Sequence, residues 1–422
     1  MKFRIYTLGC KVNAYESEVM REKLVQAGYI ESSDSSDVVI INTCSVTNIA
    51  DQKSRKMVRH FKKLYPQSIL VVAGCSSLHK TNDYQQIGVD ILLGNTEKSK
   101  IVDLIEQYVK THEKYEHVEH SRDLAFEDMT LKAFHLHTRA YMKIQDGCDN
   151  FCTYCIIPYV RGKRRNKSFA KVLEEAKELV NHGHQEIVLT GIHTGSYYDD
   201  GHDLVDVIHE ISKIKNLKRI RISSIEVSEL NEKFINELKV NPKICNHLHI
   251  PLQAGSNEIL SLMNRKYDLK FFEDKIKSIR EIRPDISIST DIIVGFPGES
   301  EELFLQTMDF AKKIGFSKIH VFPYSKREGT KASVMDNQVL EVEKESRSKR
   351  LVKLSNLLAL EYARLFEGKV MEVLIENSHE KSIGLTSNYL KVEILAPVLK
   401  NTLVLVKLHV LEDGKIIGYV VR

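Results

Sequence analysis

An apolar run leads directly into three cysteines in the stretch Ala140-Tyr141-Met142-Lys143-Ile144-Gln145-Asp146-Gly147-Cys148-Asp149-Asn150-Phe151-Cys152-Thr153-Tyr154-Cys155. The run from Ala140 to Gln145 predicts a strand, so the cysteines lie on the loop that follows it. Three thiolates on a cubane of four irons leave one iron without a protein ligand, and a small molecule can bind there. The stretch therefore predicts an iron–sulfur cluster with an open iron.

Two other interpretations explain less of this pattern. A structural zinc site usually has four ligands in paired spacings, and the sequence has no second Cys-x-x-Cys and no His-x-x-x-His pair. A thioredoxin-like Cys-x-x-Cys motif leaves Cys148 without a role. The cluster interpretation uses all three cysteines.

The sequence around this loop alternates strand and helix patterns from Thr138 to about Ser325. The candidate strands are Ala140 to Gln145, Glu186 to Thr190, Arg219 to Ser223, His247 to Ile250, Ser287 to Val294 and Lys318 to Phe322. Six strands, each followed by a helix, predict an incomplete parallel (β/α)6 barrel with its catalytic groups at the strand C-termini. The cysteine loop follows the first strand and belongs at that face.

Three cysteines separated by three and then two residues, after the first strand of a βα barrel, resemble the motif of the radical S-adenosylmethionine (SAM) enzymes. The resemblance implies that the amino and carboxylate groups of SAM chelate the open iron. An electron from the reduced cluster then cleaves the sulfonium C–S bond to give a 5′-deoxyadenosyl radical.

Further residues of the same face are predicted to contact SAM. Most of them follow a strand, beside small residues where a cofactor can approach the backbone. Tight βα turns are the commoner role of such Gly and Pro residues, and loop packing is the alternative for the aromatic residue before the last cysteine. The predicted contacts are Tyr154, Thr190, Gly191, Ser224, Glu226, Gln253 and Asp291.

The N-terminal region, residues 1–112, predicts an open parallel sheet. Its strand patterns are Lys2 to Gly9, Val38 to Thr43, Ser68 to Gly74 and Asp90 to Gly94, and its helical patterns are Ala14 to Gly28, Asn48 to Leu64 and Thr96 to Lys110. In such sheets all strand C-termini lie along one edge, where ligands bind.

Cys10, Cys44 and Cys75 each follow the end of one of these strand patterns. Free cysteine is commonly a buried core residue, but core packing gives no reason for the same position after three strands. The placement favours a second set of metal ligands that converge in space. Cys245 has no companion cysteine and is predicted to be a packing residue.

Two segments outside these domains differ in character. Residues 113–135 are polar with little periodicity and predict a linker before the central domain, residues 136–366. Residues 367–422 predict a small five-stranded barrel. Its strand patterns are Val370 to Glu376, Ser382 to Thr386, Leu390 to Leu395, Thr402 to Val410 and Ile416 to Val421.

Composition and charge suit a cytoplasmic metalloenzyme. The 422 residues, 42% of them hydrophobic, are enough for two or three domains. The net charge of +4 permits a nucleic-acid partner without requiring one. No apolar stretch approaches the roughly 18 to 20 residues of a membrane span, so no membrane partner is expected. An odd number of cysteines, seven, argues against a disulfide framework.

Basic residues gather just past the cysteine loop, in Arg161-Gly162-Lys163-Arg164-Arg165. A run of charge is usually a solvated face, but this run adjoins the predicted active face, where it is placed to hold RNA phosphates. Arg161, Lys163, Arg164 and Arg165 are therefore predicted to bind RNA. The C-terminal segment has as many acidic as basic residues and predicts no phosphate-binding face.

Taken together, the chain resembles the methylthiotransferases, radical SAM enzymes that add a CH3–S group to an unreactive carbon, essentially from end to end. The resemblance implies that Cys10, Cys44 and Cys75 hold an auxiliary 4Fe–4S cluster, that Cys148, Cys152 and Cys155 hold the radical cluster, and that the C-terminal barrel is a TRAM domain. Three motifs look most like the tRNA branch called MtaB: Thr7-Leu8-Gly9-Cys10-Lys11-Val12-Asn13, Gln145-Asp146-Gly147-Cys148 and Gly191-Ile192-His193-Thr194-Gly195.

That branch converts N6-threonylcarbamoyladenosine at position 37 of tRNA into its 2-methylthio derivative. The implied mechanism uses one SAM to methylate a sulfur on the auxiliary cluster and another to generate the radical that removes hydrogen from C2. The open irons, rather than a catalytic side chain, carry this chemistry. The implied partners are tRNA, an electron donor such as flavodoxin or ferredoxin, and a sulfur donor of unknown identity.

Two further hypotheses stay open from the sequence. One is a sister methylthiotransferase that acts on isopentenyladenosine in tRNA or on an aspartate of a ribosomal protein. The other is an RNA-binding module with purely structural clusters, which would need four cysteines for each cluster. Only Cys245 is left over for two such sites.

Overall fold

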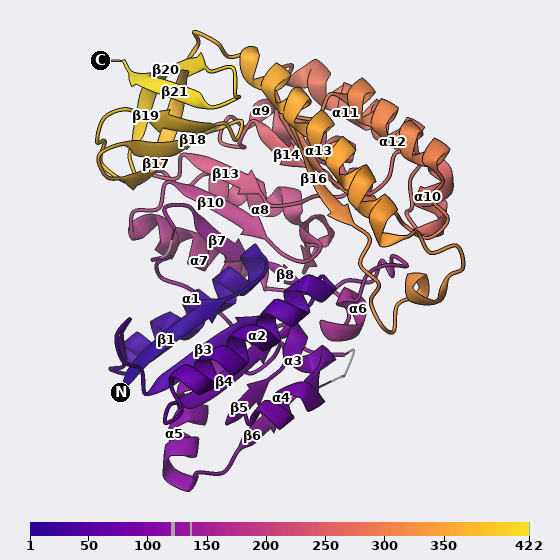
Figure 1. Cartoon of the computed structure of the whole chain (residues 1–422). Coiled ribbons are helices and arrows are strands. Elements are labelled where there is room, and N and C mark those ends of the chain that lie inside the picture. Colours follow the sequence, from indigo (N-terminus) through magenta and orange to yellow (C-terminus); the bar gives the residue numbers. More distant parts are fainter. Residues whose placement is uncertain (120–122, 136, 422) are drawn as a thin grey trace.

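A computed structural model describes residues 1–119, 123–135 and 137–421, which form an N-terminal sheet domain, a central half-barrel and a C-terminal β-barrel (Figure 1). Among these residues, no helix combines the length and the apolar character needed to cross a lipid bilayer.

The N-terminal domain is a six-stranded, entirely parallel sheet in the order β2-β1-β3-β4-β5-β6. The strands are β1 (Lys2–Thr7), β2 (Ile30–Glu31), β3 (Val38–Thr43), β4 (Ile69–Gly74), β5 (Ile91–Leu93) and β6 (Tyr115–His117). The helices are α1 (Lys11–Gln26), α2 (Asn48–Leu64), α3 (Cys75–His79), α4 (Thr81–Ile87) and α5 (Ile101–Thr111). β3 and β4 are buried along their whole length, as expected for central parallel strands.

The predicted open parallel sheet is confirmed, and two short strands add to it. β2 and β6 form the sheet's two edges. They escaped prediction because each has three residues or fewer and no apolar run. β6 falls within the segment 113–135 that was predicted as a linker, so the start of this segment belongs to the sheet.

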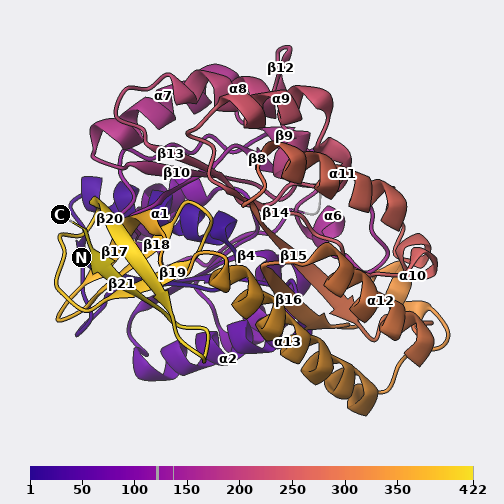
Figure 2. The ribbon, with the colours of Figure 1, turned by 90° about the horizontal axis from the view of Figure 1, so that it is seen from above.

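The central domain curves six parallel strands into an open arc (Figure 2). They form two sheets, β13-β10-β7 and β14-β15-β16, joined by a parallel bridge between Ile220 and Ile244. The strands are β7 (Ala140–Lys143), β10 (Glu186–Thr190), β13 (Arg219–Ile222), β14 (His247–His249), β15 (Ser287–Val294) and β16 (Lys318–Pro323). Each lies where the sequence predicts a strand, which confirms the incomplete barrel.

Helices cover the outer face of this arc (Figure 2). They are α7 (Phe169–Asn181), α8 (Leu204–Ser212), α9 (Glu232–Val240), α10 (Asn257–Leu262), α11 (Leu269–Ile282), α12 (Glu301–Ile314) and α13 (Glu341–Arg364). The loop after β7 carries β8 (Gln145–Asp146), the short helix α6 (Ile157–Val160) and β9 (Arg165–Asn166), and β8 pairs with β9. Farther along the chain, β11 (Tyr198–Asp199) and β12 (His202–Asp203) form a hairpin.

The last strands close into the predicted five-stranded barrel, β17-β18-β19-β21-β20. They are β17 (Val370–Ser378), β18 (Ser382–Thr386), β19 (Lys391–Ile394), β20 (Leu403–Val410) and β21 (Ile416–Val420). The barrel packs against the start of the central strands. Arg139 Nε lies 2.6 Å from Glu376 Oε1, and Arg219 Nη2 lies 3.1 Å from Glu372 Oε1.

Candidate functional site

Cys10, Cys44 and Cys75 come together at one edge of the N-terminal sheet. Cys44 directly follows β3, Cys75 begins α3, and Cys10 caps α1 three residues after β1. Gly9 has φ +102°, and a Cβ there would lie 2.8 Å from Cys44 Sγ, so only glycine lets the two loops approach this closely. Burial raises the pKa of Cys44 to about 12, and the nearby Cys75 and Cys10 thiols contribute to the rise.

The chemistry of this set fits an iron–sulfur cluster. Three clustered thiols cannot ionise together without a compensating cation, which a metal cluster supplies. The guanidinium of Arg161 also lies beside the set, with Nε 3.1 Å from Cys75 Sγ. Hydrogen bonds to ligand sulfur are a usual feature of protein-bound clusters.

Cys148, Cys152 and Cys155 form a second group on the loop after β7. Burial raises the pKa of Cys155 to about 12, with smaller contributions from Cys152 and Cys148. Arg265 Nη1 lies 3.4 Å from Cys152 Sγ, and His193 Nδ1 lies 3.9 Å from Cys148 Sγ. This group, too, has three thiols, each of which can bind one iron. The cationic side chains beside them can offset the negative charge of the thiolates.

The backbone before Cys148 is tightly held. Gly147 has φ +69°, and a Cβ there would lie 2.0 Å from the carbonyl oxygen of Lys163, which excludes any other residue. Gln145 donates to the carbonyls of Asp146 and Gly147, each at 2.8 Å, and accepts from the backbone N–H of His193 at 2.7 Å. The motif Gln145-Asp146-Gly147-Cys148 thus fixes the cysteine loop against the loop after β10.

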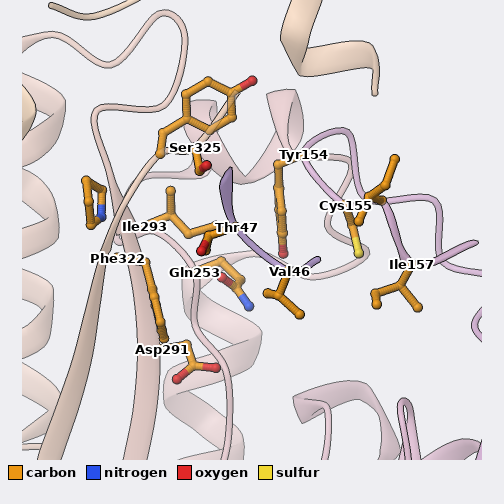
Figure 3. Close-up of a pocket in the computed structure, with 13 residues that line it drawn as sticks. Val46, Thr47, Tyr154, Cys155, Ile157, Gln253, Asp291, Ile293, Phe322 and Ser325 are labelled. Atoms are coloured by element: carbon orange, nitrogen blue, oxygen red, sulfur yellow. The ribbon is translucent and has the colours of Figure 1, made fainter. Parts of the chain in front are cut away.

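One cavity of about 180 Å³ is lined by residues from the loops of both cysteine groups. Val46 and Thr47, just past Cys44, form one wall, and Tyr154 and Cys155 form another (Figure 3). Ile156 and Ile157 follow them on the same loop, and the half-barrel completes the lining with Gln253, Asp291, Ile293, Phe322, Pro323, Tyr324 and Ser325. A molecule in this cavity would touch the loops of both groups at once.

The structure distributes the predicted SAM contacts unevenly. Tyr154, Gln253 and Asp291 line the cavity. Gly191 packs against Gln145, where an added Cβ would lie 2.9 Å from Oε1. Glu226 Oε2 lies 2.9 Å from Arg265 Nη2, next to Cys152. The remaining two lie at strand ends. Thr190 is the last residue of β10 and is buried, and Ser224 follows β13 and is half-buried.

A buried network of charges links the two cysteine groups. Glu16 of α1 pairs with Lys98, with Lys143 at 2.8 Å and with Arg161 at 3.0 Å. Asp146 also contacts Arg161 at 3.0 Å. Burial opposes ionisation of Glu16, but Arg161, Lys143 and Lys98 hold its pKa well below the usual range. Because Arg161 also contacts Cys75, the network ties the N-terminal site to the loop that carries Cys148.

This geometry corrects part of the RNA-binding prediction. Arg161 is 1% exposed and Arg165 is 8% exposed, and both pair with Asp146. Their burial contradicts contact with RNA phosphates. Lys163 and Arg164 are exposed, Lys163 with an ion pair to Asp123 at 2.6 Å, and for these two RNA contact stays a prediction.

We expect Arg161→Met to destabilise the protein by about 3–5 kcal/mol, because two buried carboxylates would lose a shared cation. The measurement is the urea midpoint of the anaerobically purified protein. Arg164→Met is the matched control, because this neighbouring arginine is exposed and its loss is expected to cost less than about 0.5 kcal/mol. Equal urea midpoints for the two variants would show that the network does not stabilise the packing of the N-terminal domain on the central domain.

Sequence reasoning missed several residues of the site. Glu16, Lys98 and Lys143 give no signal, since single charges in helical or strand patterns usually face solvent. Arg265 stands outside every motif but contacts Cys152.

Comparisons with known proteins agree with this geometry. Residues 142–311 match the model of the radical SAM superfamily, and residues 2–94 match that of the uncharacterized protein family UPF0004. In three dimensions the chain is similar to the radical SAM methyltransferase TsrM from Kitasatospora setae. That likeness has a TM-score of 0.59 and 14% identity over 79% of this chain and 77% of TsrM, and it supports the fold alone.

Full-length relatives share more of the sequence. The threonylcarbamoyladenosine tRNA methylthiotransferase MtaB of Bacillus subtilis (strain 168) is 42% identical over 92% of this chain and 89% of its own length. MtaB of Aquifex aeolicus (strain VF5) is 36% identical over 93% of this chain and 96% of its own length. The tRNA-2-methylthio-N(6)-dimethylallyladenosine synthase of Acetivibrio thermocellus is 36% identical over 88% of this chain and 79% of its own length.

Proposed function

We propose, from the premise that this chain belongs to the radical SAM tRNA methylthiotransferases, that it methylthiolates C2 of N6-threonylcarbamoyladenosine at position 37 of tRNA. The observation that supports the proposal is a cavity that the loop after Cys44 and the loop with Cys155 line together. A methylthio transfer needs a radical source and a sulfur source at the same carbon atom. The relatives named for this nucleoside support the choice of substrate.

SAM and a 4Fe–4S cluster are the cofactors of this family. In our proposal Cys148, Cys152 and Cys155 hold this cluster, which when bound supplies the electron for cleavage of SAM. Tyr154 and Gln253 line the space where SAM would bind. Arg265 compensates thiolate charge at Cys152.

We place a second 4Fe–4S cluster on Cys10, Cys44 and Cys75, and with it the sulfur to be transferred. Arg161 donates to Cys75 Sγ and so orients this ligand, while Asn95 Nδ2 donates to the carbonyl of Val160 at 2.7 Å and ties the loop after β5 to α6. Val46, Ile293 and Phe322 give the cavity apolar walls that do not react with a carbon radical as polar X–H groups would.

In the proposed reaction the hydrogen at C2 leaves on 5′-deoxyadenosine, and a methylthio group takes its place. One SAM provides the radical and another provides the methyl group. An electron donor such as reduced flavodoxin or ferredoxin and a separate sulfur donor complete the set of partners, and we expect the enzyme to work in the cytoplasm.

A second candidate substrate is N6-dimethylallyladenosine in tRNA. The synthase of Acetivibrio thermocellus named for this nucleoside is 36% identical to the chain. Its apolar substituent lacks the carboxylate of the threonyl group, so the two candidates make opposite demands on the polarity of the substrate pocket.

The test is mass spectrometry of tRNA nucleosides from cells with and without the gene, and from tRNA treated with the anaerobically reconstituted protein. We expect 2-methylthio-N6-threonylcarbamoyladenosine to depend on the protein in both experiments. Its persistence without the gene, or the appearance of a methylthiolated dimethylallyladenosine in its place, would contradict the proposal.

Lys163 and Arg164 remain the proposed phosphate contacts, next to the loop that carries Cys148. We expect the double charge reversal Lys163→Glu/Arg164→Glu to weaken tRNA binding and to reduce the slope of log affinity against log salt by roughly one to two. The measurement is fluorescence anisotropy with labelled tRNA at several salt concentrations.

Lys312→Glu/Lys313→Glu is the control for this reversal, because it changes the net charge equally on the exposed face of α12. If both double variants lower affinity alike, the effect comes from net charge and these two residues do not contact the phosphates.

A further inference from the structure

Cys75 lies where the N-terminal domain meets the loop that carries the second cysteine group. α3 begins at Cys75 and packs against α6 of that loop (Figure 1). The hydrophobic cluster between the two helices consists of Cys75, Leu78, Ile156 and Val160. Because the thiol is buried, polar groups that reach its sulfur act in a medium of low dielectric constant, where their electrostatic effect is large.

Two side-chain N–H groups reach the sulfur of Cys75. Arg161 Nε lies 3.1 Å from Sγ, and Asn95 Nδ2 lies 3.6 Å from it. The guanidinium is held in place from the other side, where Arg161 Nη2 donates to Asn13 Oδ1 at 2.9 Å. Hydrogen bonds to ligand sulfur are among the features that set the reduction potential of an iron–sulfur cluster, since they stabilise the extra negative charge of the reduced state.

The network around Arg161 contains more positive than negative charge. Its carboxylates belong to Glu16 and Asp146, and its cations are Lys98, Lys143, Arg161 and Arg165. All six side chains are buried. Glu127 accepts from the N–H of Ser99, next to Lys98 in the chain, and counting its carboxylate as well still leaves one cation in excess. The described part of the chain thus places an excess of buried positive charge beside Cys75.

The cysteine group on the loop after β7 has a different charge balance. Arg265 lies 3.4 Å from Cys152 Sγ but is paired with Glu226 at 2.9 Å. His193, the polar neighbour of another thiol of this group, is paired with Glu229. Each of these two basic side chains has its own carboxylate. We therefore expect this group to hold its cluster at a lower reduction potential than the N-terminal group, which suits the delivery of an electron to SAM.

The proposed reaction leaves one electron behind. The hydrogen atom of C2 leaves on 5′-deoxyadenosine, so the carbon carries one unpaired electron. It joins a methylthio group that is held as the anion CH3–S⁻. The carbon supplies one electron of the new C–S bond, and the sulfur lone pair supplies the other. The second electron of that lone pair stays with the site that held the sulfur, and this site must accept it.

We propose that Arg161 is a positioning residue that raises the reduction potential of the cluster in the N-terminal site, so that this site accepts the electron left by methylthio transfer. The inference rests on the proposed function and adds the requirement that the sulfur site is also an electron acceptor. Arg161 acts through its hydrogen bond to Cys75 and through its charge. Lys98 acts through its charge, since its ammonium group contacts the side chains of Glu16 and Asn95.

The experiment is an EPR-monitored redox titration of the anaerobically reconstituted protein. The signal of the N-terminal cluster is the one that Cys44→Ala removes. We expect Arg161→Gln to lower the ratio of reduced to oxidised N-terminal cluster about tenfold at a given potential, as is typical for loss of a charged hydrogen bond. For one electron this is a shift of about 59 mV to lower potential. Arg161→Lys keeps the charge and should recover most of the loss.

Lys98→Met tests the charge separately from the hydrogen bond. We expect a smaller shift than in Arg161→Gln, in the same direction, because a surplus cation is lost while the contact between Arg161 and Cys75 is kept. If Arg161→Gln fails to keep its iron, Lys98→Met and Arg161→Lys decide the question. In every variant the signal of the other cluster should keep its potential.

Arg221→Gln is the matched control. Arg221 is as buried as Arg161 and is paired with Glu186 at 2.7 Å, but it lies beside the C-terminal barrel, where it donates to the carbonyl of Ser387 at 3.2 Å. Its replacement should shift neither signal. Iron content and the urea midpoint are measured for each variant, so that a shift in potential is separated from loss of a cluster or of the fold.

A second readout is the amount of methylthiolated nucleoside formed per 5′-deoxyadenosine. In Arg161→Gln this ratio should fall about tenfold, while 5′-deoxyadenosine forms as in the wild type. Unchanged potentials in Arg161→Gln and Lys98→Met with full iron content, or an equal shift in Arg221→Gln, would overturn the inference while the proposed function stands. Wild-type protein that holds only one cluster, or that forms no methylthiolated nucleoside, would overturn the proposed function itself.

Discussion

Replacing Cys148, Cys152 and Cys155 together with Ala is expected to halve the iron content of the anaerobically reconstituted protein, from about eight to about four atoms per chain. Cleavage of SAM to 5′-deoxyadenosine should fall to background. The reason is that these three thiols form one group on one loop, and that Cys10, Cys44 and Cys75 lie on other loops. The measurements are iron analysis and chromatography of 5′-deoxyadenosine after reduction.

The seventh cysteine provides the control for this experiment. Cys245 is buried and free and belongs to neither group, so Cys245→Ala should keep all the iron and all the SAM cleavage. If the triple variant also kept its full iron content, the assignment of a cluster to the loop after β7 would be wrong.

Cys44→Ala is expected to separate the two halves of the reaction. The variant should still cleave SAM to 5′-deoxyadenosine, because the loop with Cys148 is intact, but it should form no methylthiolated nucleoside. Cys44 is a buried member of this set, and the Cys75 and Cys10 thiols lie close enough to raise its pKa, so its removal should disrupt the whole N-terminal site. About four irons should remain, and both products are measured in the same reaction.

Two results would count against this account of Cys44. Methylthiolated product from the variant would remove the N-terminal site from the mechanism. Loss of SAM cleavage together with product, at an unchanged urea midpoint, would mean that the two sites are not chemically separable. Cys245→Ala again serves as the control for loss of a buried thiol.

Much of the fold follows from the sequence because its strands are buried on both faces. Val38–Thr43 and Ser287–Val294 are near-continuous β-rich runs, and the structure has strands with these same bounds. β2 and β6 could not be found in this way. They are held by backbone pairing at the sheet edges, which leaves little hydrophobic signal in the sequence.

The candidate site was harder to predict, because sequence shows charge but not burial. Arg161 stands in a basic run that is typical of a solvated surface, yet it lies between Glu16 and Asp146, which are separated from each other by more than a hundred residues. Such partners meet only when the two domains pack. Cys10, Cys44 and Cys75 were easier to place, since the common edge of a parallel sheet brings strand ends together.

The most direct test is an anaerobic crystal structure of the reconstituted protein with SAM, with iron located by anomalous scattering. We expect two iron cubanes, one on Cys10, Cys44 and Cys75 and one on Cys148, Cys152 and Cys155. Each should direct its open iron into the cavity lined by Val46 and Gln253. A single cubane, or two whose open irons face different surfaces, would contradict the account.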